Sequence, residues 1–264
     1  MPRLHSSRAP DPDERAREGF DFLELEGDAL APTGDELPWL RPFGAAVPGA
    51  ALAGVAGTEA DEIRIPKQAR ELSALGRRLD AMLLLRRYLE EAPHASEVRV
   101  LLAEFLDADG EQEAALEELT AALRDAPDPP PVLVLRGALL ARLGRPLEAE
   151  QDLREAIRLR PAFAPAHHHL GLALLRRGLG AEAVAAFRDT LTQAPDDPDA
   201  TYYLGEAHLA AGDLPAALGA LERAAELYPD DPRTYKLMGR VLDRMGRSEE
   251  AMAMHRRARE AAAR

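Results

Sequence analysis

One spacing dominates this sequence: a glycine followed five residues later by an alanine recurs every 34 residues. The pairs are Gly76/Ala81, Gly110/Ala115, Gly144/Ala149, Gly178/Ala183, Gly212/Ala217 and Gly246/Ala251. Two further columns keep the same step, namely Pro93, Pro127, Pro161, Pro195 and Pro229, and Gly137, Gly171, Gly205 and Gly239. A period of this length predicts repeated supersecondary units, each of which buries its apolar face against its neighbours.

Six units fit the period without an insertion, and the last is one residue short. We expect them at 62–95, 96–129, 130–163, 164–197, 198–231 and 232–264. Each unit reads as a helix pair. Asp197-Pro198 and Asp231-Pro232 place a capping carboxylate before a proline that starts a helix. The recurring Gly178-type glycine suits the turn that ends the first helix.

This pattern resembles the tetratricopeptide repeat family. Unit four carries its Leu-Gly pair, glycine, alanine, aromatic residue and proline at Leu170-Gly171, Gly178, Ala183, Phe187 and Pro195. Unit five carries Leu204-Gly205, Gly212, Ala217, Ala224 and Pro229, whereas unit one lacks the Leu-Gly pair. The resemblance implies an all-α, right-handed helical solenoid with an irregular N-terminal extension. It specifies the fold closely and the function only loosely.

Residues 1–61 form the expected extension, which is acidic, rich in proline and glycine, and without a regular apolar period. It nevertheless holds two apolar clusters, which we call the tail motif. The motif comprises Phe20, Phe22, Leu23, Leu25, Trp39, Leu40 and Phe43. Such clusters suit binding hot spots. Three alternatives stay open: the motif caps unit one, docks on the chain's own repeats, or binds a partner.

Composition excludes several classes of protein. A net charge of −13 argues against a nucleic-acid-binding protein, because phosphate binding needs a basic footprint. The absence of cysteine excludes disulfide scaffolds, thiolate metal sites and thiol nucleophiles. We find no signal peptide and no apolar run long enough to span a membrane. The abundance of Ala, Arg, Gly and Pro suggests a GC-rich bacterial genome, and we expect a cytoplasmic protein.

The sequence contains no recognisable catalytic site. The phosphate-loop, His-Glu-x-x-His and Gly-x-Ser-x-Gly patterns are all absent, so we expect no enzyme and no cofactor. His167, His168 and His169 are consecutive, and consecutive helical residues point about 100° apart. These rings therefore do not converge on one metal ion, and we expect no metal site.

The first helix of each unit has two stripes. Unit positions 4, 7, 8 and 11 form the packing stripe, and positions 2, 5, 9 and 12 share another face. The resemblance implies that this second stripe and position 13 line a groove for peptides. The candidate groove residues are Val134, Ala138, Arg142, His168, Leu172, Arg176, Tyr202, Glu206, Arg233, Lys236, Arg240 and Arg244.

An apolar middle beside the basic face of unit six suits a partner segment with apolar anchors and an acidic stretch. The alternative is that these arginines pair with neighbours such as Asp243 and are merely solvated. The carboxylate clamp of chaperone adaptors in this family uses Lys, Asn and Arg, but this chain has no Asn. That role is therefore not expected.

We expect a non-catalytic scaffold or adaptor that binds a protein or peptide partner in its groove, for example an assembly factor or chaperone. The alternatives are a structural subunit of a stable complex and a targeting subunit of a separate enzyme. The sequence sets neither the partner's identity nor the oligomeric state.

Overall fold

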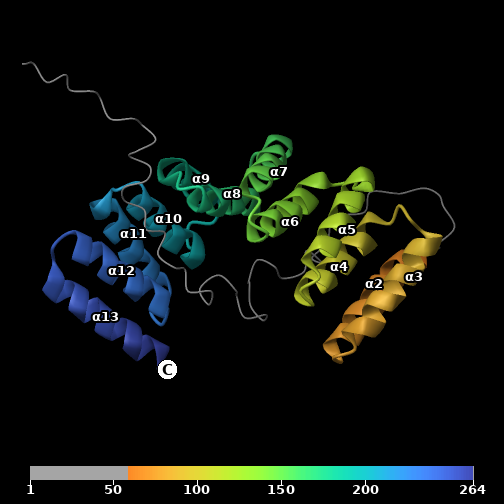
Figure 1. Ribbon diagram of the computed structural model, residues 1–264, viewed down its shortest axis with the longest axis horizontal. Helices are drawn as coiled ribbons and strands as arrows, with labels where there is room; N and C mark the ends of the chain where they lie inside the picture. Colours follow the sequence, from red (N-terminus) through yellow and green to blue (C-terminus); the bar gives the residue numbers. More distant parts are fainter. Residues whose placement is uncertain (1–58, 264) are drawn as a thin grey trace, which may run out of the picture. The chain divides into compact units, whose positions relative to one another are not determined.

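A computed structural model of the chain describes residues 59–263, with side-chain surroundings from Arg64 onward (Figure 1). Within these residues the structure consists of α-helices joined by short turns, without a β-strand. The first helices of the successive pairs are α2 (Glu59–Ala74), α4 (Ser96–Ala108), α6 (Pro129–Arg142), α8 (Ala164–Arg176), α10 (Pro198–Ala210) and α12 (Pro232–Arg244). The second helices are α3 (Arg78–Glu91), α5 (Gln112–Asp125), α7 (Pro146–Leu159), α9 (Gly180–Gln193), α11 (Leu214–Leu227) and α13 (Ser248–Ala262).

The N-terminal boundary differs slightly from the expected one. Helix α2 begins at Glu59, three residues before the first expected unit. Acidic residues at the start of this segment favour a helix N-terminus because their negative charge interacts favourably with the positive end of the helix dipole. The tail motif lies outside the described residues, so its three alternatives stay predictions.

The recurring glycines end the first helices, as expected. All six adopt a left-handed backbone, with φ between 72° and 83°. At the end of α8, the Gly178 N–H donates to the Leu175 carbonyl over 2.9 Å, and the Leu179 N–H donates to the Leu174 carbonyl over 2.9 Å. This pair of bonds satisfies carbonyls that the helix itself leaves open. The chain then reverses direction into the second helix.

A second set of glycines brings the two helices of a pair together. A Cβ atom at Gly171 of α8 would lie 2.6 Å from the ring of Phe187 on α9. Phe187 is completely buried, and Ala183 one turn before it is also buried. The helices therefore approach so closely that only glycine fits at this position. This contact explains why the column of Gly137, Gly171, Gly205 and Gly239 keeps the 34-residue step.

Stacking continues from one pair to the next. Each helix packs against the next helix along the chain, and α8 also contacts both α6 and α10. The first helices therefore line one side of the array, with α2 and α3 at one end and α12 and α13 at the other (Figure 1). The predicted caps are present: the Asp197 carboxylate accepts from the Ala200 N–H, and the Asp231 carboxylate accepts from the Arg233 N–H. None of the described helices is long and apolar enough to cross a membrane.

Candidate binding face

The candidate groove residues lie on the first helices, on the side that we call the first-helix face. We define this face by unit positions 2, 5, 9, 12 and 13. Ion pairs join neighbouring first helices along it. Arg142 of α6 pairs with Asp107 of α4, and Arg233 of α12 pairs with Asp199 of α10 at 2.9 Å. These contacts join α4 to α6 and α10 to α12 on this face.

The residues of the predicted apolar middle of this face lie at two depths relative to the protein surface. Val134 and His168 lie below the surface, with only 5% and 6% of their area exposed. Ala138, Leu172 and Tyr202 are partly exposed above them. A partner would therefore touch the second group directly, while Val134 and His168 support the surface from beneath.

An aromatic cluster forms the support of this middle region. His168 packs edge-on against Phe187 and Tyr203, with ring centroids 5.6 and 5.7 Å apart. Tyr203 stacks on Phe187 at 5.8 Å, and Tyr202 packs edge-on against Tyr203 at 5.1 Å. Tyr203 was not among the predicted groove residues. The adjacent Tyr202-Tyr203 pair was the available signal, because two neighbouring tyrosines are well suited to a contact surface.

The histidine run has a structural role in this arrangement. His167 Nε2 lies 2.8 Å from the Pro161 carbonyl, which only accepts, so this nitrogen donates. Burial lowers the pKa of His168 and lowers that of His169 to about 3. All three rings are buried in different surroundings. In the part of the chain that the structure describes, no group of three His, Asp or Glu residues is arranged to hold a metal ion.

One arginine in the middle of the face is enclosed without a carboxylate. Arg176 is half-buried, and within residues 59–263 no carboxylate lies within 4.0 Å of its guanidinium. Burial is the main cause that lowers its pKa, and the positive charge of Arg142 adds to this effect. A negatively charged group placed here would therefore be stabilised.

The basic end of the face divides into paired and unpaired cations. Burial alone would lower the pKa of Arg233, but its hydrogen bonds and ion pairs with Asp231 and Asp199 outweigh burial and raise it. Its guanidinium also lies 5.2 Å from the Tyr202 ring centre. Lys236, Arg240 and Arg244 are exposed, and the described residues offer them no ion pair within 4.0 Å.

Asp243, the neighbour expected as an alternative partner, instead lies 3.2 Å from His255. Among the cations of α12, Arg233 alone has an ion pair within 4.0 Å in the described residues, while Arg240 acts on Glu206 over a longer distance.

Two glutamates at unit position 9 also belong to this face. Burial raises the pKa of Glu104, although Arg70 opposes the shift. Burial likewise raises the pKa of Glu206, against the opposing charges of Arg240 and Arg233. Glu104 is nevertheless open to water. Neighbouring protein groups therefore replace part of the water around these two charges.

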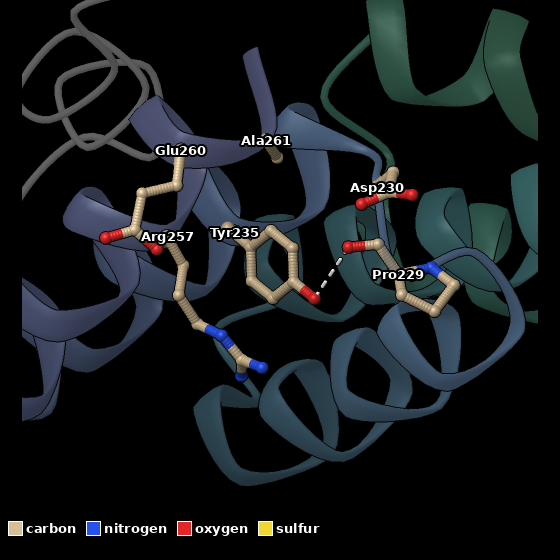
Figure 2. Close-up of a pocket in the computed structure, with 6 residues that line it drawn as sticks. All are labelled: Pro229, Asp230, Tyr235, Arg257, Glu260 and Ala261. Carbon is tan, nitrogen blue, oxygen red and sulfur yellow. Dashed lines mark hydrogen bonds between the residues drawn. The ribbon is translucent and has the colours of Figure 1, made fainter. Parts of the chain in front are cut away.

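Two shallow pockets among the described residues lie away from the predicted groove residues. One, of about 140 Å³, lies where the turn before α12 meets α13. Figure 2 shows the Tyr235 hydroxyl donating to the Pro229 carbonyl over 2.9 Å, with Arg257 beside the ring. The other is lined by α5 alone. Neither pocket is lined by a candidate groove residue.

Comparisons with known proteins agree with this architecture. Two models of the tetratricopeptide repeat family match residues 134–198 and 168–232, and residues 72–143 and 208–264. No curated protein sequence matches the chain.

Solved structures show the same fold. PilW, described as a type IV pilus biogenesis factor, is 19% identical, with a TM-score of 0.68 over 75% of this chain and 91% of PilW. MamA from Desulfovibrio magneticus RS-1 is 23% identical, with a TM-score of 0.59 over 63% of this chain and 94% of that chain. YrrB, described as having an unusual peptide-binding site, is 22% identical, with a TM-score of 0.56 over 67% of this chain and 91% of YrrB.

Proposed function

Because the chain belongs to the tetratricopeptide repeat family, we propose that it is a non-catalytic interaction protein whose first-helix face binds a segment of a partner protein. The observation that carries the proposal is the group of exposed, unpaired cations at Lys236, Arg240 and Arg244, beside the partly exposed Leu172 and Tyr202. The similarity to YrrB concerns the fold, so the proposal rests on the residues of this face.

The side chains of the first-helix face indicate which side chains a partner segment would carry. Apolar anchors would pack on Ala138, Leu172 and Tyr202, over the aromatic cluster beneath. Carboxylates would pair with Lys236 and Arg240, where they replace water around cations that lack an internal partner. A flexible segment with two or three apolar side chains and a following acidic stretch satisfies both parts.

A direct test uses the full chain and a fluorescein-labelled peptide with leucine and phenylalanine anchors followed by four glutamates. The variant Lys236→Glu/Arg240→Glu should weaken binding at least tenfold and flatten its salt dependence, because it removes two ion pairs and adds repulsion. The matched control is Arg256→Glu/Arg259→Glu, which makes the same charge change on exposed positions of α13. If both double variants lose the same affinity, the loss comes from the change in net charge, and this result would contradict a binding site on α12.

The role within the cell is part of the same proposal. We propose a scaffold or adaptor, for example an assembly factor or chaperone, in a bacterial cytoplasm as the composition suggests. The alternatives are a structural subunit of a stable complex and the targeting subunit of a separate enzyme. A partner that exchanges freely would favour the adaptor. Obligate co-purification would favour the structural subunit, and catalytic turnover by the purified chain would refute the proposal.

A further inference from the structure

An apolar stripe lies on the outer side of the first helix pair. Leu75, Leu79 and Leu83 are 74%, 69% and 63% exposed, and they follow one another at intervals of four residues. Leu79 and Leu83 therefore share one face of α3, and Leu75 lies in the turn before it. The remaining large exposed apolar residues of the described chain are scattered over other units. We call these three residues the leucine stripe.

The repeat itself does not require this stripe. At the unit position of Leu83, the later units carry small or polar residues: Glu117, Gln151, Ala185, Gly219 and Ala253. At the position of Leu79 only unit three has another leucine, Leu147, which is 61% exposed and has Gln151 one turn later. Two exposed leucines one turn apart on one helix, without such a pair at the equivalent positions of the later units, indicate a contact with another molecule or segment.

The charges around the stripe are arranged symmetrically. Asp80 lies one turn before Leu83, at the start of α3, and Arg86 and Arg87 lie one turn after it. Asp80 pairs with Arg77 across exposed side chains at 2.8 Å. Arg86 and Arg87 are exposed and have no ion pair within the described residues. The helix thus carries acid, then leucine, then base along one side.

From this order we propose that the leucine stripe binds a second copy of this chain, with the two α3 helices antiparallel and crossing at Leu83. Antiparallel pairing about Leu83 places Asp80 of one copy opposite Arg87 of the other, twice by symmetry, because both residues lie on the same side of Leu83 around the helix. It also places Leu79 against the aliphatic stem of Arg86. The face is therefore complementary to itself in charge, which an unrelated partner would not require.

The size of the contact predicts weak association. One helix from each copy buries less surface than a standard stable interface. We therefore expect a monomer–dimer equilibrium that becomes visible only at high micromolar concentration. The first-helix face takes no part in this contact, so dimerisation and partner binding are separable.

Sedimentation velocity of the full chain, from about 1 to about 500 μM, measures this equilibrium. We expect the average sedimentation coefficient to rise toward the value of a dimer across this range. Leu83→Glu should hold the chain monomeric throughout, with a dissociation constant about 100-fold higher, because the substitution enters the interface twice at roughly tenfold each. Leu147→Glu, an equally exposed leucine on α7, should leave the equilibrium unchanged.

Charge reversal tests the orientation. Arg87→Glu should weaken the dimer, and adding Asp80→Arg in the same chain should restore it, since both cross-pairs are then reversed. A wild-type chain that stays monomeric at the highest concentration would overturn the proposal. So would a dimer that Leu83→Glu and Leu147→Glu weaken equally.

Trp39 is the one tryptophan of the chain. Its quenching can therefore distinguish a dimer from a stripe that the chain's own N-terminal segment covers. If the chain is monomeric and Leu83→Glu increases acrylamide quenching of Trp39, the chain's own N-terminal segment covers the stripe, and the second copy is refuted. Peptide binding to Leu83→Glu should match that of wild type, so failure of this proposal does not touch the first-helix face.

Discussion

Two glycine-to-alanine substitutions should change stability in opposite directions. Gly171 of α8 and Gly219 of α11 are both inside helices, where alanine is intrinsically preferred by about 1 kcal/mol. Their surroundings differ completely. A Cβ at Gly219 meets no atom within 4 Å, whereas a Cβ at Gly171 would lie 2.6, 2.7 and 2.8 Å from three ring atoms of Phe187.

The magnitude follows from how firmly Phe187 is held. Its ring is completely buried, stacks on Tyr203 at 5.8 Å and meets His168 edge-on at 5.6 Å. It has no free direction in which to move, so the cost of overpacking should lie near about 3 kcal/mol. Subtracting the helix preference leaves Gly171→Ala destabilised by about 2 kcal/mol. Gly219→Ala should be stabilised by about 0.5–1 kcal/mol.

Urea unfolding of the full chain, followed by far-UV circular dichroism, gives the midpoint of each variant. We expect the midpoints to lie on opposite sides of wild type, with a difference of about 3 kcal/mol between the variants. Gly219→Ala is the control for the chemistry of the substitution itself. If Gly171→Ala is as stabilising as Gly219→Ala, the close approach of α8 and α9 is wrong.

Three further predictions concern one helix cap and two titratable groups with shifted pKa values. Asp231→Ala should lower the free energy of unfolding by about 2–3 kcal/mol, because it removes the helix cap at the Arg233 N–H and leaves the buried Thr234 hydroxyl without its acceptor. Adding Thr234→Val to this variant removes the unsatisfied hydroxyl and should recover part of the loss in urea unfolding. The pKa of His169 is lowered to about 3 from an ordinary 6.5. As the pH falls, the unfolded chain therefore binds a proton at His169 before the folded chain does. The free energy of unfolding should then fall as the pH drops below about 6.5. His169→Gln should flatten this dependence, and an unchanged slope would refute it. Burial raises the pKa of Glu206, so its carboxylate disfavours the folded state at neutral pH but not once it is protonated below 4.5. Glu206→Gln should therefore raise the thermal midpoint at pH 7 and leave it unchanged near pH 4.

The repeat was predictable because it depends on local chemistry. Gly178 and its equivalents stand where the backbone must adopt positive φ, and Asp197 and Asp231 stand where a helix needs a cap. These requirements depend on neighbours within a few residues. The helix pairs could therefore be inferred from spacing alone.

The candidate face was only partly predictable. Helical periodicity places His168 on the same stripe as Leu172, but periodicity does not give depth. His168 is buried because Phe187 and Tyr203 come from two other helices to cover it. Tyr203 was missed for the same reason, since its contact with the face depends on how α8, α9 and α10 stack.

The sequence by itself determined the helices, their turns and the order in which they stack, because a strict 34-residue period repeats the same local requirements six times. The tertiary structure alone decided which charges are neutralised. Arg233 and Arg240 share one stripe of α12, yet Arg233 reaches Asp199 on α10 while Arg240 has no ion pair among the described residues. It also decided that Leu83 is exposed while Leu85, two residues later, is completely buried. Burial and pairing depend on which helices lie within a few ångströms, and that distance is set by packing between units.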